Sequence, residues 1–521
     1  MTQWTDRIGT RNPQFLRECR GRLKSRNVIA AIALSLIVQF LLYISVAGLG
    51  GEIVPEDQRA VCVALSWLMA YVLFVLGGFY IVDDLSKEDR TGTLNFIRLS
   101  PRPAQEILLG KLLGVPLLPV ILALTAVPLH IVSGLLGGVS VLWLMSYYVV
   151  LAFGTAFVYT LALLFGFVGS ASPFGKQQAL NAIAFAAIAL VAITPLFMGW
   201  NSFATWWGFD SGSALYIEPY GGLRPRPFIQ WLYLPVVSNL LMAHLFTLGN
   251  LAIGTFLTWR VLLRTFRIPQ ATLLSKRISY VIVAYLNVLL WGFFQSSLIT
   301  SSERRILGFA AAAFALNVAI AFLLIFAIAP TRQTLIDWSR ARGGSITGWV
   351  WNDNSPSVLS ILVSAIIVGA LVVPWILIVD RGQKIAILPM ILAALSLGTC
   401  ALIYATIVQL IFSSKLRAPF VWAVGTVATM AAVPPIFLGV LDIGTDGSMT
   451  AAEMAIWTFF GLPFGIANQP GMDAAALGMG IGWALQIVVL LVLLSRLARR
   501  LKRLGEGRAL AEPLYGRIAP H

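Results

Sequence analysis

Residues 28–48 read VIAAIALSLIVQFLLYISVAG, an apolar stretch that contains no charged side chain. An α-helix rises about 1.5 Å per residue, so this stretch extends about 30 Å, the thickness of the hydrocarbon core of a bilayer. The sequence therefore predicts that residues 28–48 form a membrane-spanning helix.

Eleven further stretches share this character, because each is long enough to cross a bilayer and contains no Asp, Glu, Lys or Arg. They are residues 61–82, 112–134, 141–168, 178–200, 236–259, 278–298, 306–329, 357–379, 385–413, 418–440 and 474–495. The chain of 521 residues is 58% hydrophobic and only 11% charged. The predicted fold class is an all-α integral membrane protein with about 12 transmembrane helices.

Basic residues are distributed unevenly among the polar segments between these spans. If the N-terminus is cytoplasmic, 30 of the 37 Lys and Arg residues lie on the cytoplasmic side, which is the side that basic residues favour. The even number of spans then places the C-terminus on the same side. The net charge of +15 is explained by this topology and by attraction to anionic membrane lipids, so no nucleic-acid partner is indicated.

Three short sequence matches recur in the two halves of the chain at offsets of 256, 253 and 255 residues. The matching pairs are Asn12-Pro13-Gln14 with Ile268-Pro269-Gln270, Asp84-Leu85-Ser86-Lys87 with Asp337-Trp338-Ser339-Arg340, and Ser100-Pro101 with Ser355-Pro356. Each half also contains six predicted spans. The matches predict two fused six-span transmembrane halves of the same orientation, residues 1–262 and 263–521.

Two kinds of polar segment carry further predictions. Residues 13–26 place Phe15, Leu16, Cys19 and Leu23 on one helical face, which predicts an amphipathic N-terminal helix on the inner leaflet. A solvated basic tail is the alternative. Residues 201–235 and 441–473, on the outer side, are rich in aromatic side chains and are predicted to hold short re-entrant or interfacial helices.

The polar segment between the second and third spans, residues 83–111, is unusually charged. Eight of the 28 residues in KEDRTGTLNFIRLSPRPAQEILLGKLLG, residues 87–114, carry a charge. A short helix with an apolar edge is predicted from Thr93, Leu94, Phe96, Ile97 and Leu99. Pro101 and Pro103 end it. A charged amphipathic helix at the membrane surface can act as a lever between a cytoplasmic motor and the spans. An ordinary cytoplasmic loop is the alternative.

This segment resembles the signature of ABC-type (type 2) export permeases, the transmembrane subunits of ABC transporters. The resemblance lies in Glu88-Asp89-Arg90-Thr91-Gly92-Thr93-Leu94, Ser100-Pro101 and Gly110-Lys111, whereas Asn95 stands where the family often has Glu. It implies a coupling helix at 87–101 that docks on an ATP-binding subunit. The implied docking residues are Glu88, Arg90, Gly92, Thr93, Leu94, Phe96, Arg98 and Pro101.

The corresponding segment of the second half, residues 330–356, lacks the Gly-Thr-Leu motif. Its coupling-like residues are Trp338, Arg340, Arg342 and Trp349. Two interpretations stay open. The segment docks a second ATP-binding subunit through different contacts, or it is retained for structure alone.

The sequence contains no GxxxxGK[S/T] phosphate loop. This chain is therefore not expected to bind the phosphates of ATP through such a loop. The resemblance then implies a separate ATP-binding subunit, in two copies, which holds ATP and Mg and performs the hydrolysis. No catalytic, cofactor-binding or metal-binding residue is predicted in this chain, which has three scattered histidines and no HExxH motif. Asp83-Asp84 lacks the second acidic pair expected of a membrane transferase.

The expected function is the membrane-spanning permease subunit of an ATP-driven exporter in the cell inner (plasma) membrane. The direction of transport and the bacterial location follow from the resemblance alone. Spans without charge suit a lipid-like, amphipathic or largely uncharged substrate.

One alternative is a twelve-span secondary transporter, although ion-coupled carriers generally keep ionisable residues within the bilayer. Another is a membrane assembly protein without transport activity.

Overall fold

The structure is a computed structural model that describes residues 12–48, 54–170, 178–206, 215–217, 223–225, 230–236, 240–269, 271–295, 303–341, 346–379, 387–441, 450–461 and 472–506. The chain divides into two compact units. Unit 1 comprises residues 1–229 and 234–270, and unit 2 comprises residues 230–233 and 271–521. The division lies close to residue 262, where the sequence predicted the boundary between two halves.

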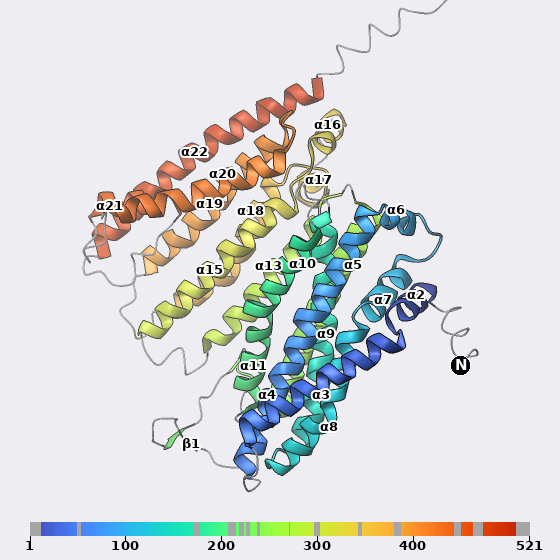
Figure 1. Cartoon of the computed structure of the whole chain (residues 1–521). Coiled ribbons are helices and arrows are strands. Elements are labelled where there is room, and N and C mark those ends of the chain that lie inside the picture. Colours follow the sequence, from blue (N-terminus) through green and yellow to red (C-terminus); the bar gives the residue numbers. More distant parts are fainter. Residues whose placement is uncertain are drawn as a thin grey trace, which may run out of the picture. The chain divides into compact units, whose positions relative to one another are not determined.

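The described part of unit 1 contains helices and one small hairpin (Figure 1). Its elements are α2 (Pro13–Arg22), α3 (Ser25–Ala47), α4 (Pro55–Tyr71), η1 (Val72–Gly77), α5 (Gly78–Arg90), α6 (Thr93–Arg98), α7 (Ala104–Gly114), α8 (Leu117–Leu136), α9 (Val141–Ser170), α10 (Gln178–Ile188), η2 (Ala189–Ile193), α11 (Thr194–Trp206), β1 (Leu215–Ile217), β2 (Leu223–Pro225) and α12 (Leu240–Arg267).

The described part of unit 2 is helical. Its elements are α13 (Lys276–Trp291), η3 (Gly292–Gln295), α15 (Glu303–Ala327), α16 (Arg332–Arg340), α17 (Ile346–Trp351), α18 (Val358–Val379), α19 (Ile387–Phe412), α20 (Pro419–Val440), α21 (Ala451–Phe459) and α22 (Met472–Glu506). Residues 230–233 belong to this unit, because Trp231 Nε1 donates a hydrogen bond of 3.0 Å to the carbonyl of Leu289 in α13.

Twelve helices in the described ranges are long and apolar enough to cross a membrane, six in each unit. This confirms the predicted all-α, twelve-span membrane protein. The second span is a continuous helix of 36 residues, Pro55–Arg90, built from α4, η1 and α5. It contains a π-helical turn at η1 and continues past the predicted end at residue 82 into the polar segment.

The same pairs of spans pack against each other in both units. The first and third spans pack as α3 with α8 and as α13 with α18. The second and fourth pack as α5 with α9 and as α15 with α19, and the fourth and sixth as α9 with α12 and as α19 with α22. Three pairs of spans are therefore packed alike in the two units, and the internal repeat stays a prediction of the sequence.

The predicted N-terminal helix is α2, which begins at Pro13. The side chain of Asn12 accepts a hydrogen bond of 2.9 Å from the backbone N–H of Phe15, and this cap starts the helix. The helix ends at Arg22 instead of residue 26, because Lys24 is extended and α3 begins at Ser25. It packs along α7, as Figure 1 shows.

The two predicted outer segments differ in structure. Residues 441–473 contain the short helix α21, which starts with a reciprocal capping box between Thr450 and Glu453. In the described part of residues 201–235 that follows α11, the prediction of a short helix is wrong. The antiparallel strands β1 and β2 form there, in a sequence whose prolines and paired glycines disfavour helix.

Helices α21 and α22 approach each other so closely that two glycines of α22 leave no room for a side chain. A Cβ atom at Gly478 would clash with the carbonyl oxygen of Ala451, and one at Gly482 with that of Ala455. Gly480 lies between them in sequence, and a Cβ there would meet no atom within 4 Å. The contact between these helices therefore depends on two glycines and not on the third.

We expect Gly482→Ala to lower the thermal stability of the purified protein in detergent, because the new methyl group must push α21 away at a cost of about 1–3 kcal/mol. Gly480→Ala is the matched control. It should leave the melting temperature unchanged or raise it slightly, since alanine is the better helix former. An equal loss in both variants would contradict the close approach of α21 and α22.

Candidate functional site

The Gly-Thr part of the family-like motif forms a tight turn at the end of the second span. Gly92, between α5 and α6, has a φ of 74°, a left-handed conformation that glycine adopts without strain. The hydroxyls of Thr91 and Thr93 donate to the carbonyl of Glu88 at 3.2 and 3.1 Å. These bonds supply donors to a backbone carbonyl in the last turn of α5, and they direct the chain into α6.

Helix α6 has an anchored side and an exposed side. Leu94 and Ile97 are buried in the hydrophobic core of unit 1. Phe96 and Leu99, the residue that ends the helix, are 79% and 85% exposed. The helix is thus fixed to unit 1 by two side chains while it presents two large apolar side chains outward.

Beside α6, a buried lysine joins α7 to the end of the second span. Lys111 lies in α7 and its side chain is 2% exposed. Its Nζ atom lies 2.8 Å from Asp84 Oδ2 and 2.6 Å from Glu88 Oε2, both on α5. Asp84 and Glu88 are four residues apart, so they share one face of the helix.

Helix α2 brings two further cations to the same carboxylates. Arg22 Nη2 lies 2.7 Å from Asp84 Oδ1, and Arg17 pairs with Glu88. Glu18 completes the group, at 3.2 Å from Arg17 Nη2 and 3.6 Å from Arg22 Nε. We call these six residues the Lys111 cluster: Arg17, Glu18, Arg22, Asp84, Glu88 and Lys111. It connects α2, α5 and α7.

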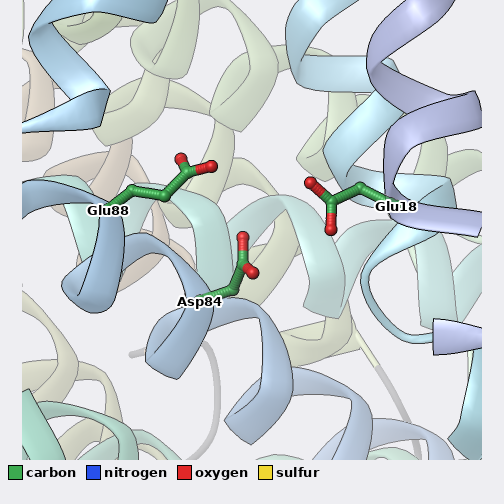
Figure 2. A group of neighbouring side chains, drawn as sticks. All are labelled: Glu18, Asp84 and Glu88. Carbon is green, nitrogen blue, oxygen red and sulfur yellow. The ribbon is translucent and has the colours of Figure 1, made fainter. Parts of the chain in front are cut away.

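The carboxylates of Glu18, Asp84 and Glu88 point toward one another in Figure 2, with oxygen atoms within 4.8 Å. Such a group can hold a metal ion when no other cation is near. Here three carboxylates are matched by three cationic side chains of the cluster. A divalent cation would have to displace Lys111 or an arginine, so the arrangement is an ion-pair cluster rather than a metal centre.

Two of the eight predicted docking residues need correction. Glu88 and Leu94 are only 8% and 1% exposed, because Glu88 is held by Lys111 and Leu94 fills the core. Neither side chain can be the direct contact with a partner that the sequence suggested. Arg98 is half-buried, and the remaining five are exposed, namely Arg90, Gly92, Thr93, Phe96 and Pro101.

Sequence reasoning did not assign roles to Arg17, Arg22 or Lys111. In the sequence, Lys111 stands out only as part of the Gly110-Lys111 pair of the family-like motif. The only local signal was the spacing of Asp84 and Glu88, which places two acids on one helical face. The cations that meet them come from other elements, so the local sequence could not reveal the pairs.

The coupling-like segment of unit 2 is built differently. Trp338 of α16 packs edge-to-face against Trp349 of α17, with ring centroids 4.8 Å apart. The buried Lys276 Nζ donates to the carbonyls of Trp349 and Pro356 at 2.9 and 3.2 Å. Arg340 Nη1 lies 3.9 Å from Asp337 Oδ1 of its own helix. Arg342 lies outside the described residues.

Unit 2 also contains a large apolar cavity of about 550 Å³ between α13, α15, α18 and α19. Aliphatic side chains form most of its wall, and Asn317, Ser364 and Thr399 add a few polar groups. Asn317 is already engaged, because it exchanges two amide hydrogen bonds of 3.0 Å with Asn287. A cavity of this composition suits an apolar molecule with little hydrogen-bonding capacity.

Comparison with known protein families, with curated proteins and with solved structures finds no match to this chain. The interpretation of the site therefore depends on its own geometry.

We expect Lys111→Met to destabilise the protein by about 3–5 kcal/mol, because it leaves the three carboxylates of the Lys111 cluster with only two cations. Thermal unfolding in detergent should show a lower melting temperature. The double variant Lys111→Met, Glu88→Gln should recover much of the loss, since it again leaves equal numbers of acidic and cationic side chains in the cluster. Lys87→Met, at an exposed position of α5, is the control. Equal melting temperatures for Lys111→Met and Lys87→Met would contradict the ion pairs.

Proposed function

We propose that this chain is the membrane-spanning permease subunit of an ATP-driven exporter, comparable to the ABC-type export permeases that its sequence resembles. One observation supports this above all. A short helix at the polar end of a membrane-spanning helix is anchored by Leu94 and Ile97 and exposes Phe96 and Leu99. Exposed apolar side chains of this kind are typical of a docking surface.

The connection between α6 and the membrane favours a lever. The second span is one continuous helix from Pro55 to Arg90, and only the turn at Gly92 separates it from α6. The Lys111 cluster ties the same helix to α2 and α7. A displacement of α6 by a docked subunit would therefore move α2, α5 and α7 together.

The chemical step is assigned to the partner in this proposal. Two copies of a separate ATP-binding subunit bind ATP and Mg, approach each other and hydrolyse the nucleotide. This chain contributes the docking helix, the mechanical connection and the substrate path. In the same proposal the protein lies in the inner (plasma) membrane with both termini in the cytoplasm, as the distribution of basic residues indicates.

A lipid-like or amphipathic substrate fits this account best. The apolar cavity of unit 2 would accept acyl chains, and its few polar groups would tolerate a small uncharged end. A secondary transporter is the rival function, and it is separated from the exporter by whether the protein has an ATPase partner.

Affinity capture of the detergent-solubilised protein from its host, with mass spectrometry of the proteins that accompany it, tests the proposal. We expect a stoichiometric soluble protein that carries a GxxxxGK[S/T] phosphate loop. Its absence under gentle conditions would favour the secondary transporter.

The double variant Phe96→Ser, Leu99→Ser should recover about tenfold less of that partner, because the two side chains form the centre of the proposed contact. Both are exposed, so the substitutions should not affect folding. Leu416→Ser, at another exposed apolar position between α19 and α20, should retain the partner. Full recovery with the double variant would place the docking surface elsewhere.

A further inference from the structure

An open pocket of about 600 Å³ lies beside α6 in unit 1, between the first turn of α7 and the end of α12. Three of the residues that line it are arginines, Arg98, Arg102 and Arg267, and none is acidic. The Lys111 cluster is composed of other residues. Leu99 of the proposed docking surface also lines this pocket, and Arg98 is one of the docking residues that the sequence implied, whereas Arg102 and Arg267 belong to neither feature.

Arg98 is held in place by aromatic rings rather than by an acidic partner. Its Cζ atom lies 5.3 Å from the ring centre of Phe167 and 5.9 Å from that of Phe266, within the range of cation–π contacts. Burial lowers the pKa of Arg98, while the charge of Asp89 acts in the opposite direction. Within the described part of the chain, the buried Nε atom has no hydrogen-bond partner.

Within the described residues, the other two arginines have side chains that are accessible to a ligand. Arg267 is exposed at the end of α12. Arg102 pairs with Glu106 at 3.4 Å, but both side chains are nearly half exposed, so water weakens this pair. The residue Ala104, which also lines the pocket, begins α7. The positive end of that helix dipole adds to the three cations.

We propose that this pocket binds a phosphate group, carried by an anionic lipid headgroup or by a small soluble phosphate compound. Guanidinium groups match the geometry of phosphate oxygens and bind them through paired hydrogen bonds. Basic pockets between membrane helices on the cytoplasmic side are suited to anionic headgroups. A phosphate bound here would bridge α6, α7 and α12. This inference does not depend on the proposed transport function.

The test measures ligand-induced stabilisation of the full-length protein in a neutral detergent. Short-chain phosphatidylglycerol, short-chain phosphatidylcholine and inorganic phosphate are titrated separately while the melting temperature is recorded. A saturable rise with phosphatidylglycerol alone identifies a lipid headgroup as the source. A saturable rise with inorganic phosphate identifies a soluble phosphate. Both outcomes support the site if the variants below abolish or weaken the rise.

Arg267→Gln is the main variant, because Arg267 is exposed and its loss should not affect folding. We expect the apparent affinity to fall about tenfold, as for the loss of one charge-assisted hydrogen bond. Arg98→Lys keeps the charge but loses the paired donors, so it should also weaken binding. Arg20→Gln, an exposed arginine of α2, removes one charge outside the pocket and should bind as the wild type does.

Two results would overturn the proposal. One is the lack of any saturable rise with either phosphate probe. The other is an equal loss of affinity in Arg20→Gln and Arg267→Gln, which would mean that the probes respond to the net charge of the protein and not to a pocket.

Discussion

One ammonium group, that of Lys111, holds the polar end of unit 1 together. Transfer of a lysine charge out of water is costly, and the cost is offset only if acidic partners come within ion-pair distance. Asp84 and Glu88 meet that condition at 2.8 and 2.6 Å. The same two carboxylates then bind Arg22 and Arg17 of α2. The position of the N-terminal helix depends on this arrangement.

The two units share their spans and their packing but not their polar ends. In unit 1 the buried lysine belongs to α7 and is neutralised by carboxylates. In unit 2 the buried lysine, Lys276, begins the first span. Its Nζ atom donates to the carbonyls of Trp349 and Pro356 and its backbone N–H to the carboxylate of Asp353, while two tryptophans hold α16 against α17. A partner that binds both polar ends would meet different surfaces. The two interpretations of residues 330–356 that the sequence left open are therefore both compatible with a fused pair of unequal halves.

The spans were the most predictable part of the fold, because an apolar run of about twenty residues has few alternatives to a membrane helix. Which side of each polar helix is buried was harder to predict. On α2 the most deeply buried side chain is Glu18 and not Phe15 or Leu16, since Glu18 packs against Gly114 of α7. On α6, the core packing of unit 1 decides that Leu94 is inside and Phe96 outside. Contacts of this kind join residues far apart in sequence, and local spacing does not encode them.

The central claim is that Lys111 fixes α2 and α7 to the end of the second span. Hydrogen–deuterium exchange, followed by mass spectrometry, measures this directly when wild-type protein is compared with Lys111→Met. If the account is correct, amide exchange accelerates in residues 13–22 and 104–114, whereas the helices of unit 2 exchange as in the wild type. Unchanged exchange in both segments would contradict the account, because another contact would then hold these helices in place.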